Sequence, residues 1–291
     1  MRSFGTFVKF IPPLLSRGKP GLIFLRLRGG IGNQLFIYFG GLYIANSLGC
    51  RILFDTRGID HEDSIKEMSL PGHFLSNKLV LKFIDFFFLN RSQILDYDVE
   101  GIEGIKNRSL PLIPVRGFFQ SKLYYETLLK SGIIFENIFT NRLDTAGLSL
   151  MENSVLIHIR GGDFLNMKNE IGCLGTNYYV EVKKIIDLKG FRQIYVTTDD
   201  EIYASQLLNN AGFQEFIFLQ QKNLRSYECL NYFRYFKSIF LANSTFSWWG
   251  AQLAPSDSEV YAPNIWFRKN LEDVNPLLCE KWIVLQSIWS D

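Results

Sequence analysis

A histidine, an arginine and an aspartate follow one another closely in VLIHIRGGDF, residues 155–164. The first three residues of this segment are apolar, which is typical of a buried strand. His158 and Arg160 alternate along the strand, so both side chains leave the same face near its end, and two glycines then allow a sharp turn before Asp163. Ligands of open α/β sheets bind at the carboxyl ends of strands. These three groups therefore suit an anionic substrate whose charge grows during reaction, and the alternative is an ordinary strand end with a solvated arginine.

A glycine-rich loop, RGGIGNQLF at residues 28–36, lies between an expected strand and an expected helix. Such a turn presents backbone N–H groups at the positive end of the helix, which suits a phosphate group. Asn33 and Gln34 add side chains that can bind ligand hydroxyls or phosphate, although Asn33 also suits a helix cap. The rival interpretation is a nicotinamide cofactor whose ribose is bound by Asp55. It is disfavoured because Leu35 replaces the third glycine of the GxGxxG pattern.

A second loop of this kind is NSTFSWWGAQLA, residues 243–254, which follows an apolar strand and begins a helix. Ser244, Thr245 and Ser247 supply three hydroxyls next to the free N–H groups of the helix start. This combination forms a neutral anion site. The alternative is a serine or threonine cap, for which one hydroxyl is enough.

Two acidic pairs offer further chemistry. Asp199 and Asp200 end a strand in VTTDDE, where they can cap the next helix, hold a metal, or accept hydrogen bonds from the base or ribose of a nucleotide. Asp96 and Asp98 form a DxD triplet, a pair that can bind a divalent ion and a sugar-nucleotide diphosphate. Because the triplet lies in a polar region without a clear strand and helix around it, we expect it at the surface. The HExxH, GxSxG and Walker patterns do not occur.

The elements that must position these motifs alternate between strand and helix. Strands are expected at residues 21–27, 50–55, 155–157, 193–197, 215–219, 238–242 and 260–262, and helices at 35–48, 178–187, 201–210 and 227–238. Residues 57–114 show no clear pattern, and the apolar stretch 79–89 within them is too short to span a bilayer and is expected to be a buried element. The loop GFFQSKLYYE from Gly117 should lead into a helix that ends near Ser131. We therefore predict two facing Rossmann-like domains with parallel sheets, at residues 21–150 and 151–291.

Composition excludes several classes of protein. The 291 residues carry a net charge of only +2, which does not favour nucleic-acid binding, and the four scattered cysteines form no CxxC pair for zinc. Isolated thiols suit a reducing compartment, so we expect a cytoplasmic protein. Residues 1–20 form a leader that contains phenylalanines, basic residues and two adjacent prolines. This leader either contacts the inner face of the membrane peripherally or extends free of it.

Taken together, these segments resemble the bacterial α-1,2-fucosyltransferase family. The family loop GGxGNQxFQYA is matched by GGIGNQLFIYF, its GYFQS by GFFQS, its HxRRGDY by HIRGGDF, and its strand end Asp-Asp by Asp199 and Asp200. NSTFSWW is matched residue for residue, and AP-x-x-WF by APNIWF. One departure matters, because Gly161 stands where the family has a second arginine. The change from tyrosine to Phe164 is milder.

The resemblance implies a GT-B fold and an inverting, metal-independent transfer of fucose from GDP-fucose to the 2-hydroxyl of a terminal galactose in a bacterial surface glycan of the O-antigen type. Its partners would be GDP-fucose and a galactose-terminated oligosaccharide, with residues 21–150 on the acceptor side, residues 151–291 binding the donor, and no cofactor. It assigns Arg160 to the diphosphate, while Asp163 is the nearest carboxylate to serve as the base, with Glu170 in reserve. Asp163 bracing Arg160 or capping a turn is equally open. The predicted catalytic residues are Arg160, Asp163 and His158. The predicted donor-binding residues are Gly30, Gly32, Asn33, Gln34, Asp199, Asp200, Ser244, Thr245, Phe246 and Ser247.

Three alternatives stay open at this point. A divalent metal held by Asp96 and Asp98 would require chelator-sensitive activity. A nicotinamide oxidoreductase would use the glycine-rich loop and Asp55. A glycan-binding module without catalysis is conceivable because Gly161 replaces an arginine.

Overall fold

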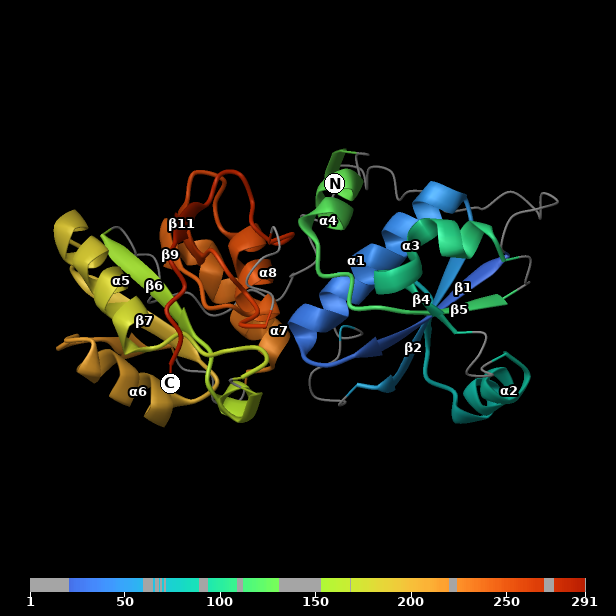
Figure 1. The fold of residues 1–291 in the computed structure, drawn as a ribbon, viewed down its shortest axis with the longest axis horizontal. Coiled ribbons are helices and arrows are strands. Elements are labelled where there is room, and N and C mark those ends of the chain that lie inside the picture. Colours follow the sequence, from blue (N-terminus) through green and yellow to red (C-terminus); the bar gives the residue numbers. More distant parts are fainter. Residues whose placement is uncertain are drawn as a thin grey trace, which may run out of the picture. The chain divides into compact units, whose positions relative to one another are not determined.

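The structure is a computed structural model that describes residues 21–59, 65, 68, 70, 72–88, 94–108, 112–130, 153–167, 169–219, 224–269 and 275–290. The chain divides into two compact units, Met1–Thr140 and Asn141–Asp291, each of which is considered by itself (Figure 1). The leader expected at residues 1–20 lies outside the described residues. Within the described part of the chain, every helix is too short or too polar to cross a membrane.

The N-terminal unit is built on a parallel sheet of five strands in the order β3-β2-β1-β5-β4. Its strands are β1 (Leu22–Arg28), β2 (Arg51–Gly58), β3 (Phe74–Leu75), β4 (Leu95–Asp96) and β5 (Leu112–Arg116). Its helices are α1 (Ile31–Leu48), α2 (Lys78–Phe88), α3 (Tyr97–Lys106) and α4 (Lys122–Lys130). The expected helix thus begins four residues early, because the glycine-rich motif itself forms the first turn of α1.

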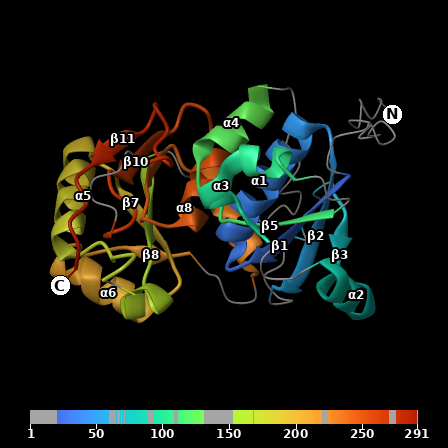
Figure 2. The ribbon, with the colours of Figure 1, turned by 45° about the vertical axis from the view of Figure 1, so that its right-hand side comes forward.

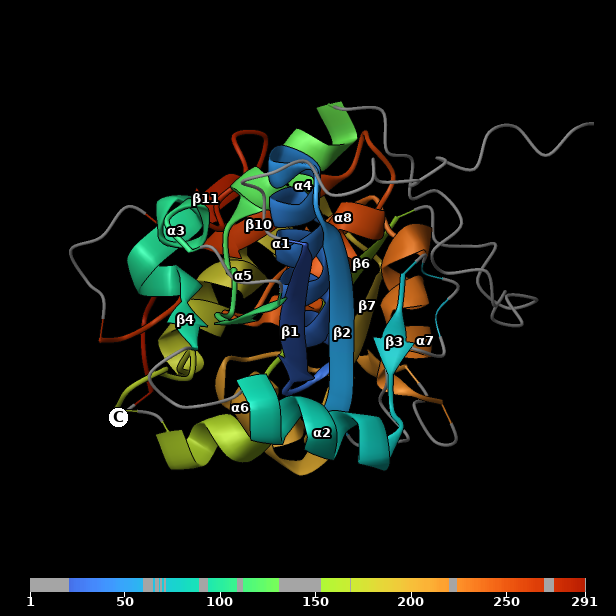
Figure 3. The ribbon, with the colours of Figure 1, turned by 90° about the vertical axis from the view of Figure 1, so that its right-hand side faces the viewer.

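Helices α1 and α2 pack on opposite faces of this sheet, as Figures 1 and 3 show. The two-residue period of a strand sends Leu25 of β1 toward α1 and Phe24 toward α2, where Phe24 joins Leu81 in one core cluster. Close packing on the α1 side depends on Gly41, since a Cβ atom there would lie 2.4 Å from Ile52 Cδ1 and 2.8 Å from Leu25 Cδ1. The close helix–strand packing that the third glycine of GxGxxG provides in dinucleotide-binding folds is thus made here by Gly41, further along the helix.

The expectation of an irregular segment at residues 57–114 was wrong. The segment contains β3, α2, β4, α3 and the start of β5. Two of these strands have only two residues each, which is too short to show an alternating pattern. The apolar stretch 79–89 is also not a wholly buried element: Leu81 and Ile84 are buried, whereas Leu79 is 78% exposed.

The C-terminal unit has a parallel sheet of six strands in the order β11-β10-β9-β6-β7-β8. Its strands are β6 (Ser154–Ile159), β7 (Gln193–Thr198), β8 (Ile217–Phe218), β9 (Ser238–Phe240), β10 (Glu259–Pro263) and β11 (Ile283–Leu285). Its helices are α5 (Thr176–Lys189), α6 (Glu201–Asn210), α7 (Ser226–Cys229) and α8 (Thr245–Leu253), with 3₁₀ segments at Gly162–Met167 and Leu230–Tyr235. Counted from β6, this is the Rossmann order 3-2-1-4-5-6.

Helices α5 and α6 lie on one side of this sheet and α8 on the other (Figure 2). Val155, Ile157 and Ile159 of β6 belong to the core cluster shared with α5 and α6. The alternate position His158 faces the other side, where its ring lies 5.3 Å from that of Phe246 on α8. The alternation inferred for β6 is thus confirmed. Strand β11 was not expected, since its three residues carry no distinctive pattern.

Candidate active site

The strand order of the C-terminal unit brings two of the sequence motifs together. The order reverses between β6 and β9, and such a switch point opens a crevice at the carboxyl ends of the two strands. Strand β6 is followed there by Arg160 and two glycines, and β9 leads to the NSTFSWW segment at the start of α8. This end of the sheet therefore carries a guanidinium next to a helix N-terminus, an arrangement suited to anions.

Arg160 is held by two carboxylates. Its Nη1 atom lies 2.9 Å from Asp199 Oδ2, and its Nη2 atom forms an ion pair with Asp163. The guanidinium also lies over the ring of Phe164, 4.8 Å from the ring centroid. Its Nε atom is buried and has no hydrogen-bond partner among the described residues. Asp163 is 62% exposed and Asp199 only 29%, so the Asp163 partner is the one that can readily move away.

His158 is buried, with 4% exposure, and packs beside the rings of Phe246 and Phe233. Burial, with the nearby charge of Arg160 adding to it, lowers the pKa of His158 to about 3. The imidazole is therefore neutral at physiological pH, and its Nδ1 atom has no hydrogen-bond partner in the described structure. Because the imidazole is neutral, it adds no charge of its own at this end of the sheet.

Asp199 fixes the backbone of the glycine turn as well as Arg160. The N–H group of Gly161 donates to Asp199 Oδ1 at 2.9 Å. Gly162 has a φ angle of 47°, and a Cβ atom there would lie 2.4 Å from Asp199 Oδ2. The positive φ and the close carboxylate both require glycine at position 162. Asp200, by contrast, caps α6 by accepting a hydrogen bond from the Tyr203 N–H at 2.9 Å, which is the helix-capping role expected as the default.

At the start of α8 the hydroxyl groups have different roles. Ser244 caps the helix, with its Oγ atom accepting from the Phe246 N–H at 3.3 Å. Ser247 is fully buried and its hydroxyl contacts the carbonyl oxygens of Ala242 and Ser244, each at 3.0 Å. Ser247 therefore shapes the turn from within. Thr245 and Phe246 are partly exposed, so their side chains are placed where a ligand can reach them.

The residue in place of the family's second arginine has a structural counterpart. A Cβ atom on Gly161 would lie 2.7 Å from Tyr203 Cδ1 and 3.2 Å from Asp200 Cβ. The ring of Tyr203 thus occupies the space that the first carbon of a side chain at position 161 would need. Burial raises the pKa of Tyr203 to about 12, so this ring stays neutral.

We expect Gly161→Ala to lower the free energy of unfolding by about 1–3 kcal/mol, because the added methyl group overpacks against a ring held on α6. Urea unfolding measures the change. Tyr203→Ala has a cost of its own, but in that background Gly161→Ala should cost much less than in wild type, since the ring atom that the methyl group meets is gone. If Gly161→Ala costs the same in both backgrounds, the two positions do not compete for this space.

The N-terminal unit has a switch point of its own between β1 and β5, and it gathers the other two loops. Asn33 Oδ1 accepts a hydrogen bond from Gln120 Nε2 at 3.0 Å, joining the GGIGNQ and GFFQS motifs. The guanidinium of Arg28 lies 4.0 Å from the centroid of the Phe118 ring. Gly30 is exposed, and a Cβ atom there would meet nothing within 4 Å, so the first turn of α1 is open to a ligand.

Gln34 is a support within this loop. Its side chain is fully buried, its Nε2 atom donates to the Gly29 carbonyl at 2.9 Å, and its Oε1 atom accepts from the Ile65 N–H at 3.0 Å. The amide thus links the glycine turn at one end to the backbone of Ile65 at the other. Gly32 is buried next to it in the first turn of α1. The direct ligand contact expected of Gln34 is replaced by this internal role.

The two aspartates of the DxD triplet also bind other groups of the protein. Asp96 forms an ion pair with Arg116 at 3.0 Å, and Asp98 Oδ2 accepts from the Phe118 N–H at 2.8 Å. The triplet therefore braces the GFFQS loop. In the described ranges, no group of three or more histidine, cysteine or acidic side chains is arranged to hold a metal ion.

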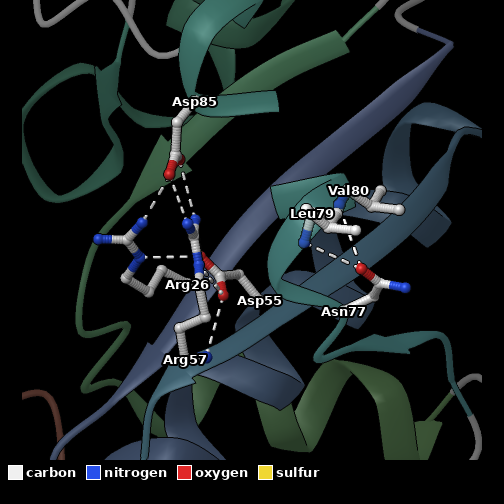
Figure 4. Close-up of polar contacts among 7 residues, drawn as sticks. All are labelled: Arg26, Asp55, Arg57, Asn77, Leu79, Val80 and Asp85. Carbon is white, nitrogen blue, oxygen red and sulfur yellow. Dashed lines mark hydrogen bonds and ion pairs between the residues drawn. The ribbon is translucent and has the colours of Figure 1, made fainter. Parts of the chain in front are cut away.

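Asp55, the candidate ribose ligand of the nicotinamide interpretation, is fully buried in a cluster of charges (Figure 4). Arg26 Nε lies 2.9 Å and Arg57 Nη2 2.8 Å from Asp55 Oδ2, and Arg57 also forms an ion pair with Asp85 of α2. Burial would raise the pKa of Asp55, but the hydrogen bonds from Arg57 and Arg26 outweigh it and hold the pKa below its ordinary value. This carboxylate is committed to arginines, so it does not favour a nicotinamide site.

Two residues of the site escaped the sequence reasoning. Gln120 was placed in a motif without a role, and its contact with Asn33 spans 87 positions of the chain. Tyr203 lies in a helix, where a partly buried aromatic residue is common and does not suggest a site. Only the glycine at position 161 could have indicated that a large side chain packs beside the turn.

Comparison with known proteins identifies a class of enzyme. No model of a known protein family matches the chain. An alpha-1,2-colitosyltransferase of Escherichia coli is 27% identical over 297 residues, covering 91% of this chain and 99% of the relative. The O-antigen biosynthesis glycosyltransferase WbnK of Escherichia coli is 31% identical over 140 residues, which is 46% of this chain and 45% of that protein. A crystal structure of POFUT1 in complex with GDP matches with a TM-score of 0.50 and 11% identity over 84% of this chain and 98% of that one.

The fold likeness and the sequence relatives agree on one class. The predicted α/β architecture of GT-B type is confirmed, with two parallel sheets. The homologues are glycosyltransferases, so glycosyltransferase chemistry is the activity that the comparisons support.

Proposed function

We propose that the protein is an inverting glycosyltransferase that moves fucose, or a closely related deoxy sugar, from its GDP-linked form to the 2-hydroxyl of a terminal galactose in an O-antigen type glycan. The observation that carries the proposal is the switch point of the C-terminal unit, where Arg160 and the start of α8 meet at the carboxyl ends of β6 and β9. Four of the motifs shared with the fucosyltransferase family follow the strands at the switch points of the two units: GGIGNQ after β1, GFFQS after β5, HIRGGDF at the end of β6 and NSTFSWW after β9. The relatives named for colitose transfer and O-antigen biosynthesis support the acceptor class.

The reaction needs charge stabilisation more than covalent chemistry. The acceptor oxygen forms a bond to C1 of the sugar while the bond from C1 to the phosphate oxygen breaks, and GDP leaves with the electron pair. The acceptor proton passes to a base. Negative charge therefore grows on the phosphate, where fixed donors aimed at it in advance provide the largest catalytic contribution.

Arg160 is the principal donor of this kind. Asp199 holds Nη1 and so fixes the plane of the guanidinium, while Nε and Nη2 form the edge available to phosphate oxygens once Asp163 has moved. The N–H groups at the start of α8 add donors of lower charge. Together, the guanidinium and the N–H groups would neutralise the charge on the diphosphate, which a divalent ion does in metal-dependent glycosyltransferases. We therefore propose that the transfer needs no metal.

The reaction also needs a general base for the acceptor hydroxyl, and Asp163 is our candidate. Its carboxylate contacts Arg160 in the structure, so it must exchange that contact for the acceptor hydroxyl when the diphosphate binds. Its exposure of 62% and its place on the 3₁₀ segment Gly162–Met167 leave room for the movement. Glu170 is exposed three residues beyond this segment's end and is the reserve.

Donor binding can be tested separately from turnover. We expect GDP at about 100 times its dissociation constant to stabilise the protein by about 2.7 kcal/mol, whereas NAD should not shift the melting temperature. The measurement is a thermal-shift titration with GDP, ADP and NAD. Stabilisation by NAD alone would contradict the proposal.

Turnover then distinguishes the sugar and the metal requirement. GDP-fucose and GDP-colitose, whose sugars differ at C3, are offered with a β-galactoside acceptor in the presence and absence of EDTA. We expect transfer to galactose O2, unchanged by the chelator. Complete loss of activity in EDTA, restored by Mg²⁺ or Mn²⁺, would overturn the metal-independent mechanism.

A further inference from the structure

The outer face of α2 exposes several large apolar side chains. Leu79, Phe83 and Phe86 are 78%, 57% and 83% exposed, and Val80 next to them is 44% exposed. Spacings of four and three residues place the first three side chains in one stripe along the helix. Scattered exposed apolar residues are ordinary, but a stripe of large ones along a whole helix indicates a surface that is covered in the working state.

The inner face of α2 explains why this stripe points outward. Leu81 and Ile84 are buried in the cluster that includes Phe24 and Leu112 of the sheet. Asp85 is fixed by Arg57, and Asn77 Oδ1 accepts from the N–H groups of Leu79 at 2.9 Å and Val80 at 3.3 Å, which defines the helix start (Figure 4). The rotation of α2 about its axis is thus set by the protein, and the stripe cannot turn inward.

The charges on α2 identify what covers the stripe. At 100° per residue, Lys78 and Lys82 border the stripe, and both are exposed. The helix's single acidic side chain is Asp85, which is neutralised by the ion pair with Arg57 and, at 3.8 Å, by Arg26. The exposed side of α2 therefore combines leucine and phenylalanine with positive charge alone.

This combination is that of a helix which lies in the surface of a bilayer. An interfacial helix buries its apolar face about 5–10 Å deep while lysines contact anionic headgroups. With 11 residues, α2 is too short to span a membrane, and apolar helices of about 10–14 residues belong either in a core or at an interface. We infer that α2 docks the N-terminal unit onto an anionic phospholipid bilayer, through the stripe Leu79, Phe83 and Phe86 and the flanking Lys78 and Lys82.

The test is flotation of the full chain with vesicles of phosphatidylglycerol and phosphatidylcholine, or of phosphatidylcholine alone. We expect binding to the anionic vesicles, and a triple variant L79Q/F83Q/F86Q should bind about tenfold or more weakly, because it removes the apolar surface that would enter the bilayer. K78E/K82E should weaken binding to the anionic vesicles and flatten its dependence on salt. The matched control is L188Q/I202Q, which removes side chains of 87% and 75% exposure from two helices of the C-terminal unit and should bind like wild type.

Three results would overturn the inference. Wild type that does not bind anionic vesicles contradicts it directly. A triple variant that binds as strongly as wild type places the contact elsewhere in the chain. A wild-type dimer in solution that the triple variant converts to monomers, without vesicle binding, makes the stripe a contact between copies. Urea unfolding curves close to that of wild type verify that all variants are folded, and since vesicle binding requires neither donor nor acceptor, failure of this inference is distinct from failure of the proposed transfer.

Discussion

Replacing Arg160 with alanine is expected to lower kcat/KM about 10²–10³-fold, comparable with the loss of one strong donor from an oxyanion site. Under the proposed mechanism, the charge that grows on the phosphate would lose the guanidinium that stabilises it, and Asp163 and Asp199 would lose their common partner. Most of the loss should fall on kcat, because the contact strengthens as the bond to phosphate breaks. Steady-state kinetics with varied GDP-fucose measures both constants.

Two variants make this result specific. Arg160→Lys keeps the charge but loses the planar fork, so it should recover only part of the activity. Arg192→Ala removes an exposed arginine just before β7, at the other end of the same sheet, and should turn over like wild type. Turnover of Arg160→Ala within threefold of wild type, or an equal loss in Arg192→Ala, would show that Arg160 does not stabilise the transition state.

Asp55→Asn is expected to have the largest effect on stability, lowering the free energy of unfolding by about 3 kcal/mol at pH 7. The substitution removes the charge that compensates two arginines at a fully buried position, although Arg57 keeps its contact with Asp85. Urea unfolding measures the loss. The control is Glu103→Gln, which breaks an exposed ion pair with Lys106 in the same unit and should cost less than about 1 kcal/mol.

The pH dependence of this difference follows from the lowered pKa of Asp55. A carboxyl whose pKa is lower in the folded state stabilises the fold above its unfolded pKa of about 3.9, and that stabilisation is lost as the pH falls through the folded pKa. The stability gap between wild type and Asp55→Asn should therefore be constant from about pH 6 to 8 and shrink below about pH 4. A gap that widens on acidification would mean that Asp55 is not held as a carboxylate.

Long periodic segments made much of the fold predictable from the sequence. Helix α6 occupies the expected residues 201–210, and the apolar run at residues 155–157 lies inside β6. The order of the strands could not be read in the same way, because pairing such as that of β6 with β9 is decided by packing between distant segments. Strands of two or three residues, such as β3 and β11, are defined by their neighbours more than by their own side chains.

The candidate site shows the same division. The motif positions were found because glycines, hydroxyls and charges stand out between apolar segments. What each side chain does was less predictable: Gln34 and Ser247 have the types of ligand-binding residues but direct all their described hydrogen bonds inward. Residue type indicates what a group can bind, while burial and the nearest partner decide whether it faces the ligand.

The contact between Gly161 and Tyr203 also bears on how this chain can diverge from its homologues. A side chain at position 161 and a large ring at position 203 cannot occupy the same volume, so substitutions at these two sites are coupled. A homologue that carries arginine at the first site needs a smaller residue, or a displaced helix, at the second. In this chain, the glycine turn is therefore bordered by a neutral aromatic ring at the place where an arginine side chain would begin.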